Sequence, residues 1–400
     1  MNTRTPTRRF EARRAAIVAS AIEVMNRKGV RGMTLGEVAA RLDLVPTGVI
    51  YYFRNKEALA QACYLNGVER FNALIAQGEA GTDVAERLTL FLDAYFAFRR
   101  QVAEHRAEDV VLFNDVRALN DATVNAAYVE LFRAIRSLLV APGAEARSRN
   151  ALNARAHMLL AEVLWSIVWL PRRDPEDYGW VARRFGSMVC DGLAAPGARW
   201  DPVPLTDLMA ARREDSAELF LCAATELINE QGYVGASVEK ISARLNVTKG
   251  AFYHHNAAKD DLVQACFERT LEVMRLAVRQ AEAVTTSGYQ ALASIAASLV
   301  EYQVSGNAPL LRTSALTLAP EAIQGRLIAQ FDRLSERFAS MICDGVADGS
   351  LRPVDVNIAA QMFTGMINAA AELRAWTRDL TPAEAVELYV RPFFEGLAGA

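Results

Sequence analysis

The chain has 400 residues, more than one hydrophobic core usually serves, so two or more domains are expected. A composition of 52% hydrophobic and 23% charged residues excludes a disordered or fibrous protein, and the net charge of -3 identifies no partner. Mean hydropathy is +0.07 without an apolar run of about 18 residues, which argues against a membrane-spanning helix. Five cysteines without a C-x-x-C pair predict reduced thiols in a cytoplasmic protein, and the basic start leads into an amphipathic helix rather than a signal peptide.

The first predicted elements are a long amphipathic helix and two short helices behind it. The first short helix covers Leu35–Leu42, with Thr34 as its N-cap and Glu37 completing a capping box. A turn at Asp43 leads into the second short helix, Pro46–Tyr52. Two short helices joined by a tight turn predict a helix-turn-helix, a motif that lays its second helix in the DNA major groove.

The rest of the chain also reads as helices of roughly 8–25 residues joined by short turns, without strand-like alternation. Helix starts near the end of each half are marked by a capping side chain before proline, at Asp174-Pro175 and at Thr381-Pro382. Prolines and a glycine interrupt the pattern within residues 196–211, which indicates a linker. The predicted fold class is all-α.

The chain repeats itself at a displacement of 203 positions. Residues 17–63 recur without a gap at 220–266, so that Gly29, predicted to end the long helix, becomes Gly232. The same displacement relates Ala156 to Ala359 and later apolar positions to one another. A duplicated helical domain predicts a first headpiece at 1–60, a first body at 61–195, the linker at 196–211, a second headpiece at 212–263 and a second body at 264–400.

Both copies of the repeat resemble the TetR family of transcriptional regulators. The residues that carry this resemblance are TLGEVAARLDLVPTGVIYYFRNKEAL at 34–59 and SVEKISARLNVTKGAFYHHNAAKDDL at 237–262. The first copy departs from the family pattern at Val45 and Ile50, where a Ser/Thr cap and a Tyr are usual. The second departs at Asn246, often Gly in the family, and at Asn256, usually Phe.

The resemblance implies that Pro46–Tyr52 and Lys249–His255 are recognition helices. Glycine near the start of such a helix allows the backbone to approach DNA closely, and a lysine at the next helix start holds phosphate oxygens. The implied DNA-contacting residues are Thr34, Thr47, Gly48, Tyr51, Tyr52 and Lys56 in the first copy, and Ser237, Thr248, Lys249, Gly250, Tyr253, His254 and Lys259 in the second.

Ordinary structural roles remain open for several of these residues. Thr34 and Ser237 cap helices in any interpretation, and both clamp lysines could be merely solvated. Core packing, rather than base readout, is favoured for Phe53, Phe252 and Tyr253. The pair His254-His255 does not share a helix face, so no metal site is predicted, and no cofactor is expected.

Charge separates the two headpieces. Residues 1–60 carry 11 basic and 5 acidic side chains, a balance of +6, whereas residues 205–265 carry 6 and 9, a balance of -3. Since phosphate neutralisation supplies most non-specific affinity, the first headpiece should bind DNA more strongly. Its arm with Arg4, Arg8 and Arg9 either adds DNA contacts or stays a solvated tail.

Members of the resembled family dimerise through their last two helices and hold a ligand inside the larger helical part. The corresponding helices are 150–170 and 176–195 in the first copy, and 354–377 and 382–397 in the second. Pairing within one chain would give an intramolecular pseudo-dimer, with further homodimerisation left open. The pocket candidates are Tyr95, Phe98, Phe113, Trp165, Tyr302 and Phe363, and Phe331 is a further aromatic of the second copy; at helical spacing such residues are usually ordinary core.

The resulting hypothesis is a ligand-responsive repressor that binds an imperfect palindromic double-stranded DNA operator and an unidentified small-molecule effector. The alternative is a ligand-sensing or dimerisation scaffold with one degenerate headpiece, motivated by Asn256 and the acidic second copy. An enzyme is not predicted, because the chain has four histidines, no Gly-rich phosphate loop and no nucleophile motif.

Overall fold

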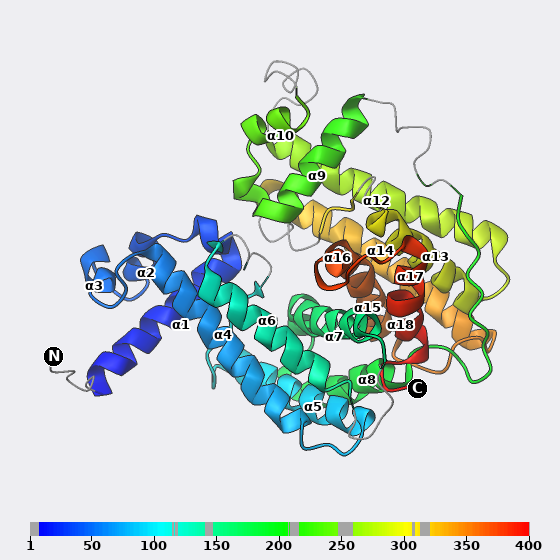
Figure 1. The fold of residues 1–400 in the computed structure, drawn as a ribbon, viewed down its shortest axis with the longest axis horizontal. Coiled ribbons are helices and arrows are strands. Elements are labelled where there is room, and N and C mark those ends of the chain that lie inside the picture. Colours follow the sequence, from blue (N-terminus) through cyan, green and yellow to red (C-terminus); the bar gives the residue numbers. More distant parts are fainter. Residues whose placement is uncertain are drawn as a thin grey trace.

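The computed structural model describes residues 8–113, 116, 119–140, 147–206, 208, 216–246, 259–305, 309–312 and 321–399. Within these ranges the secondary structure is helical, apart from one isolated bridge between Ala194 and Leu351, so the all-α prediction is confirmed (Figure 1). No helix in the described ranges combines the length and the apolar character needed to cross a bilayer.

The first half of the chain is here called the first unit. Its elements are α1 (Arg8–Gly32), α2 (Leu35–Ala40), α3 (Pro46–Ile50), α4 (Lys56–Gly78), α5 (Val84–Ala103), α6 (Ala122–Ser137), α7 (Arg149–Trp169), η2 (Leu170–Arg172), η3 (Pro175–Asp177) and α8 (Tyr178–Asp191). Helix α5 packs against α8 and α4, and α4 packs against α6.

The second unit follows the same order with more breaks near its end. Its described elements are α9 (Ser216–Gly235), α10 (Val238–Arg244), α12 (Lys259–Val284), α13 (Gly288–Val304), α14 (Glu321–Ala347), α15 (Val356–Ala369), η6 (Ala370–Glu372), α16 (Leu373–Trp376), α17 (Pro382–Ala385), η7 (Val386–Val390) and α18 (Arg391–Glu395). The predicted helix 382–397 is present over Pro382–Glu395, two residues shorter than expected. It contains a π-helical turn at Val386–Val390, followed by Pro392, which lacks the backbone N–H that a regular helix would use.

The structure differs from two predictions about the ends of the first helices. Helix α1 does not end at Gly29, where φ is 71°, but kinks there and continues to Gly32. Thr34 accepts a hydrogen bond from the Glu37 N–H at 3.2 Å, yet the Glu37 carboxylate pairs with Arg27 and Lys28 instead of closing a capping box.

The proline-marked helix starts differ from each other. Asp174 makes no side-chain cap, because Pro175 opens a short 3₁₀ turn there. Thr381, in contrast, forms a complete capping box with Glu384.

The duplication is visible in matched internal contacts. The Cys63 thiol donates to the Val18 carbonyl at 3.8 Å, and 203 positions later the Cys266 thiol donates to the Leu221 carbonyl at 3.6 Å. Burial raises the pKa of both thiols to about 12. All five cysteines are unpaired, so these two act as buried packing residues between the first and fourth helices of each headpiece.

The two units pack against each other through their last helices. Helix α7 contacts α15 and η7, and α8 contacts α15 and α18. Backbone amides of Leu193 and Ala194 donate to the Phe394 carbonyl at 2.8 and 2.9 Å, and the Leu397 amide donates to the Val189 carbonyl at 2.8 Å. The chain ends of the two units therefore exchange backbone hydrogen bonds, which fixes their relative position.

Both headpieces project from this joined body. In Figure 1, α2 and α3 lie at the left and α10 lies at the top, while α8, α14 and α18 lie to the right and below. Helices α1 and α9, which correspond in the repeat, contact each other. Linker residues 203–205 lie along the second body, where the Val203 amide donates to Ser294 Oγ at 2.9 Å and the Leu205 amide to Ser298 Oγ at 3.2 Å.

Candidate nucleic-acid interface

The first helix-turn-helix is closed by a residue in the left-handed backbone region. Asp43 has φ of 55°, and the Leu44 amide donates to the Ala39 carbonyl at 2.9 Å. Aspartate and asparagine tolerate this conformation better than most residues, which explains why Asp43 and Asn246, also at φ 55°, occupy the same turn in the two copies. Asn246 thus performs the backbone role that glycine often has in the resembled family.

Helix α3 is anchored on one side and exposed on the other. Val49 is fully buried, whereas Val45, Ile50 and Tyr51 are 65%, 46% and 74% exposed. Thr47 is also exposed, next to Gly48. Large apolar side chains that face solvent beside a small polar one form a surface suited to a partner.

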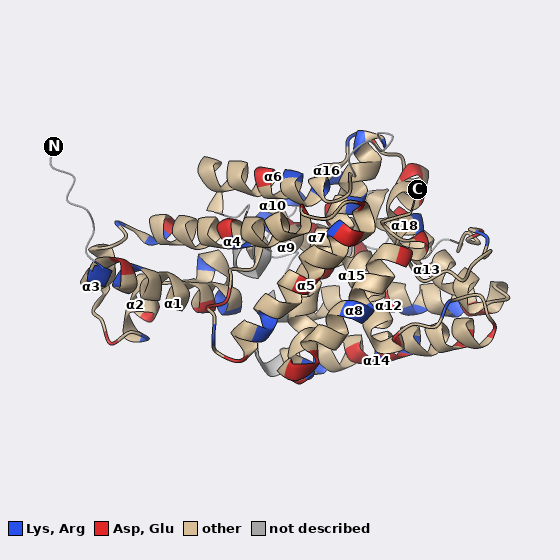
Figure 2. Cartoon of the chain, turned by 90° about the horizontal axis from the view of Figure 1, so that it is seen from below, with Lys and Arg blue, Asp and Glu red and all other residues tan. Residues whose placement is uncertain are grey.

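Three aromatic rings connect the start of α1 to this helix. The Phe10 ring centroid lies 4.8 Å from that of Tyr52 and 6.1 Å from that of Tyr51. The exposed Arg8, Arg9 and Arg13 belong to the same first turns of α1. The basic start of the described chain therefore lies beside the exposed face of α3, at the left of Figure 2.

Lys56 opens α4 directly after its N-cap, Asn55, whose side chain accepts from the Ala58 N–H at 2.8 Å. The Lys56 ammonium donates to the Arg31 carbonyl at 2.7 Å, and partial burial lowers its pKa. An ammonium has three N–H donors, so this hydrogen bond leaves further donors that can bind a phosphate oxygen. The buried Phe53 packs under Arg14 at 5.0 Å, in agreement with the prediction that it is a core residue.

The second headpiece is described only in part. Ser237 caps α10 by accepting from the Lys240 N–H at 3.3 Å, and Arg244 pairs with Glu226 and Glu230 at 3.0 Å each. The predicted contact residues Thr248, Lys249, Gly250, Tyr253 and His254 lie outside the described residues, as does the side chain of Lys259.

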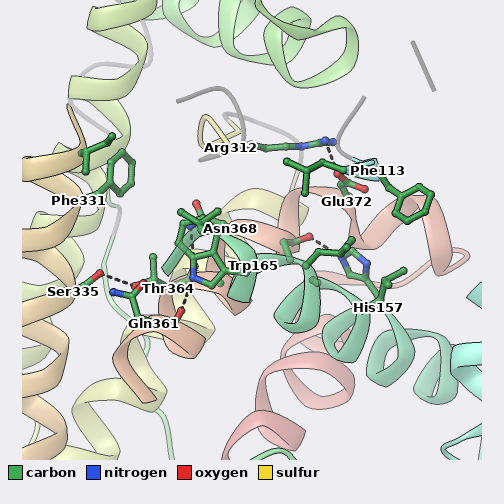
Figure 3. A pocket seen from close by; sticks show the side chains of 18 of the residues that line it. Phe113, His157, Trp165, Arg312, Phe331, Ser335, Gln361, Thr364, Asn368 and Glu372 are labelled. Atoms are coloured by element: carbon green, nitrogen blue, oxygen red, sulfur yellow. Dashed lines mark hydrogen bonds and ion pairs between the residues drawn. The ribbon is translucent and has the colours of Figure 1, made fainter. Parts of the chain in front are cut away.

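The predicted pocket residues do not gather in one place. A cavity of about 260 Å³, here called the interface cavity, lies between the units and is lined by Phe113, Trp165 and Phe331 among others (Figure 3). Four candidates do not line it. Tyr95 is buried with its hydroxyl donating to the Val163 carbonyl, and Tyr302 accepts from buried Arg269.

The other two candidates are also packing residues. Phe98 is buried with the Arg70 guanidinium 5.2 Å from its ring, and Phe363 is fully buried against Phe338. Sequence reasoning favoured aromatic rings and missed the polar lining residues Arg312, Gln361 and Asn368. Polar side chains on an otherwise apolar helix were the signal that could have identified the last two.

Known proteins resemble both copies of the repeat. The family model TetR_N, bacterial regulatory proteins of the tetR family, matches residues 17–63 and 220–266. The Transposon Tn10 TetC protein of Escherichia coli is 37% identical over 89 residues, which are 22% of this chain and 45% of that protein. The HTH-type transcriptional repressor DhaR of Mycobacterium sp. (strain GP1) is 26% identical over 131 residues, which are 32% of this chain and 66% of that protein.

These alignments cover less than two thirds of either relative. Among solved structures, the TetR family transcriptional regulator PfmR from Thermus thermophilus aligns at a TM-score of 0.36 and 23% identity, over 44% of this chain and 98% of that one.

Proposed function

We infer from the match of TetR_N to both copies of the repeat that the chain belongs to the TetR family and carries two TetR-type units in tandem. From this premise we propose that it is a sequence-specific DNA-binding transcriptional regulator, a repressor that responds to a small ligand. The observation that carries the proposal is the exposed face of α3, where Thr47, Ile50 and Tyr51 project from a helix anchored by buried Val49. Such a helix offers side chains to base edges without disturbing its own packing.

The two headpieces of one chain occupy the two half-sites of one operator. The backbone bonds between the chain ends, such as Leu193 and Ala194 to Phe394, support this intramolecular pseudo-dimer. Because the recognition helices differ, PTGVIYY against KGAFYHH, the preferred operator is an imperfect palindrome. Ligand binding lowers operator affinity by stabilising an arrangement of the headpieces that does not match the groove spacing.

A second candidate function is a scaffold whose second headpiece does not bind DNA. It is favoured by the pairing of Arg244 with Glu226 and Glu230, which neutralises one of the few basic groups there. In that case only the first headpiece contributes sequence preference.

Selection of bound duplexes from a random DNA pool, followed by equilibrium titration, tests both candidates. We expect one motif with two unlike half-sites. Thr47→Ala and Lys249→Ala should each weaken binding about tenfold or more and relax base preference in one half-site only. Thr89→Ala, at an exposed helical threonine of the body, is the matched control and should leave binding unchanged.

The outcomes separate the hypotheses. If Lys249→Ala leaves affinity and preference intact while Thr47→Ala does not, the scaffold is correct. A wild-type chain that enriches no sequence at all contradicts both.

A further inference from the structure

The interface cavity is shared by the two units. Leu112, Phe113 and Trp165 come from the first unit, and Arg312, Gln361 and Asn368 come from the second. In Figure 3, Trp165 and Asn368 lie close together near its middle, with Ser335 and Thr364 on one side and Arg312 with Glu372 on the other. Its volume of about 260 Å³ is just below the usual range of roughly 300–1,000 Å³ for small-molecule sites, so a small ligand fits.

Corresponding positions of the duplicated sequence line the cavity with opposite chemistry. A displacement of 203 relates Ala161 to Thr364 and Trp165 to Asn368, and all four residues line it. At these two positions the first unit contributes apolar side chains, beside Leu160, Leu164 and Val168, where the second unit contributes polar groups. The cavity is asymmetric, so it offers one orientation to one molecule per chain.

Asn368 supplies an unused hydrogen-bond acceptor. The side chain is 8% exposed, and its Nδ2 donates to the Thr364 carbonyl at 2.9 Å, which fixes the orientation of the amide. Its Oδ1 is buried and has no hydrogen-bond partner in the described structure. A buried acceptor without a partner destabilises the free protein, and a ligand that donates a hydrogen bond removes this penalty.

The charges around the cavity are already compensated. Arg312 forms an ion pair with Glu372, and Arg172 pairs with Asp332 at 2.8 Å. A charged ligand would have to break one of these pairs, whereas a neutral ligand leaves them intact.

The cavity wall is joined to both headpieces by equivalent asparagines. Asn26 of α1 donates to the Val110 carbonyl at 3.0 Å and accepts from the Leu112 N–H at 2.8 Å. Asn229 of α9, 203 positions later, donates to the Leu310 carbonyl at 2.9 Å and accepts from the Arg312 N–H at 3.0 Å. Leu112 and Arg312 both line the cavity, so hydrogen bonds join its wall to the first helix of each headpiece.

We propose that the interface cavity is the effector site of the regulator. It binds one neutral, mainly apolar molecule with a hydroxyl or N–H donor, held by Asn368 and sensed through Asn26 and Asn229. The proposal rests on the proposed function for its regulatory meaning. It differs from a pocket inside each unit in predicting a single molecule per chain.

Calorimetric titration of the full chain with two matched probe pairs tests the site. Indole and 2-naphthol carry a donor, and benzofuran and naphthalene do not. We expect one indole or 2-naphthol per chain, with the donor-free partner binding about threefold to tenfold more weakly, the effect of one neutral hydrogen bond. Asn368→Leu should abolish the discrimination within each pair, and Ala161→Phe should block all four probes by filling the cavity.

Retained discrimination in Asn368→Leu, two probes per chain, or no binding of any probe would overturn the site. Thermal unfolding of each variant establishes that it is folded. These titrations contain no DNA, and the operator selection contains no probe. Failure of the site and failure of the proposed function are therefore distinguishable.

Amide hydrogen exchange tests the connection to the headpieces. The bound probe should slow exchange at the amides of Leu112 and Arg312 together, because each amide bonds an asparagine at the cavity wall. In Asn26→Ala the slowing should persist at Arg312 and disappear at Leu112. Unchanged exchange at both amides of the wild type would contradict the connection.

Discussion

At Gly48 the first recognition helix presents its backbone rather than a side chain. A Cβ added there would meet only Leu44, at 3.6 Å or more, which is ordinary van der Waals contact. The free protein therefore does not require glycine at this position, which agrees with the proposed close approach of the backbone to DNA.

Gly48→Ala should accordingly separate folding from DNA binding. We expect an unchanged or slightly raised Tm, because alanine is the better helix former by about 1 kcal/mol. Affinity for the selected operator should fall, by about 1–3 kcal/mol if the added methyl overpacks the contact with DNA. The control is Gly179→Ala, at an exposed glycine of α8 where an added Cβ would have nothing within 4 Å. It should raise Tm only by the effect of helix propensity and leave operator affinity unchanged. Equal operator affinity of Gly48→Ala and wild type would contradict a close backbone approach.

The burial of Glu162 on α7 could not be predicted from the sequence pattern. Its side chain lies in the core, and both carboxyl oxygens are buried without hydrogen-bond partners. Burial raises the pKa of Glu162 well above its ordinary value of 4.5. Burial, together with the nearby Glu162 carboxyl, also raises the pKa of Tyr389. The buried Glu162 carboxyl destabilises the fold less in its neutral form than in its ionised form.

The sign of the resulting pH dependence follows from linkage. Since the folded pKa exceeds the unfolded one, stability is fully present below about pH 4.5 and is lost as the pH rises toward the raised value. Glu162→Met should remove this loss and raise Tm at pH 8, with an advantage that shrinks toward pH 4.5. Removing the orphaned polar group itself adds about 1–3 kcal/mol at all pH values. A Tm difference that grows toward low pH would contradict the account.

At the scale of elements, the two units hold equivalent segments by different means. In the first, buried Arg99 pairs with Asp109 at 2.5 Å, just before the segment that Asn26 binds. In the second, Arg269 pairs with Glu218, donates to the Pro309 carbonyl at 3.0 Å and donates to the Tyr302 hydroxyl at 2.8 Å. Both arrangements fix the connection between headpiece and body.

The Arg269 arrangement predicts a non-additive pair of substitutions. Arg269→Leu leaves Glu218 buried without its partner and should lower the free energy of unfolding by about 3–5 kcal/mol. Arg269→Leu with Glu218→Leu removes both charges and should recover much of this loss. Chemical denaturation measures both, and a double variant no more stable than the single one would show that the pair is not the controlling interaction.

Elements could be predicted where local chemistry decides them. Caps at Thr34 and Ser237 and the turn at Asp43 place the headpiece helices within a few residues. The π-helical turn at Val386–Val390 could not be predicted, because it forms where that segment packs against α7 and α13, far away in sequence. The interface cavity was missed for the same reason, since its two walls come from opposite units.

At the scale of the whole molecule, two glycines allow the C-terminal segments of the two units to cross. Gly192 has φ of 69°, and a Cβ there would overlap the Phe394 carbonyl; Gly396 has φ of 93°, and a Cβ there would overlap the Cys190 carbonyl. Both positions lie where one unit bonds the other through backbone groups. The duplication predicted two units, but this crossing depends on long-range packing that no local pattern encodes.

Gly192→Ala should therefore loosen the junction between the units. Gly197→Ala is a matched control, since Gly197 also has positive φ, 83°, but has nothing within 4 Å of its added Cβ. The backbone strain, about 1–2 kcal/mol, is common to both variants, so only Gly192→Ala should lose more than that in thermal unfolding. Equal losses in the two variants would show that the close approach contributes nothing.

One chain is proposed to place both of its headpieces on one operator. Sedimentation equilibrium of the full chain with the selected duplex, carrying both half-sites, measures this directly through the mass of the saturated complex. We expect one chain per duplex, with no concentration-dependent pairing of chains. Two chains bound to each duplex, one per half-site, would contradict it.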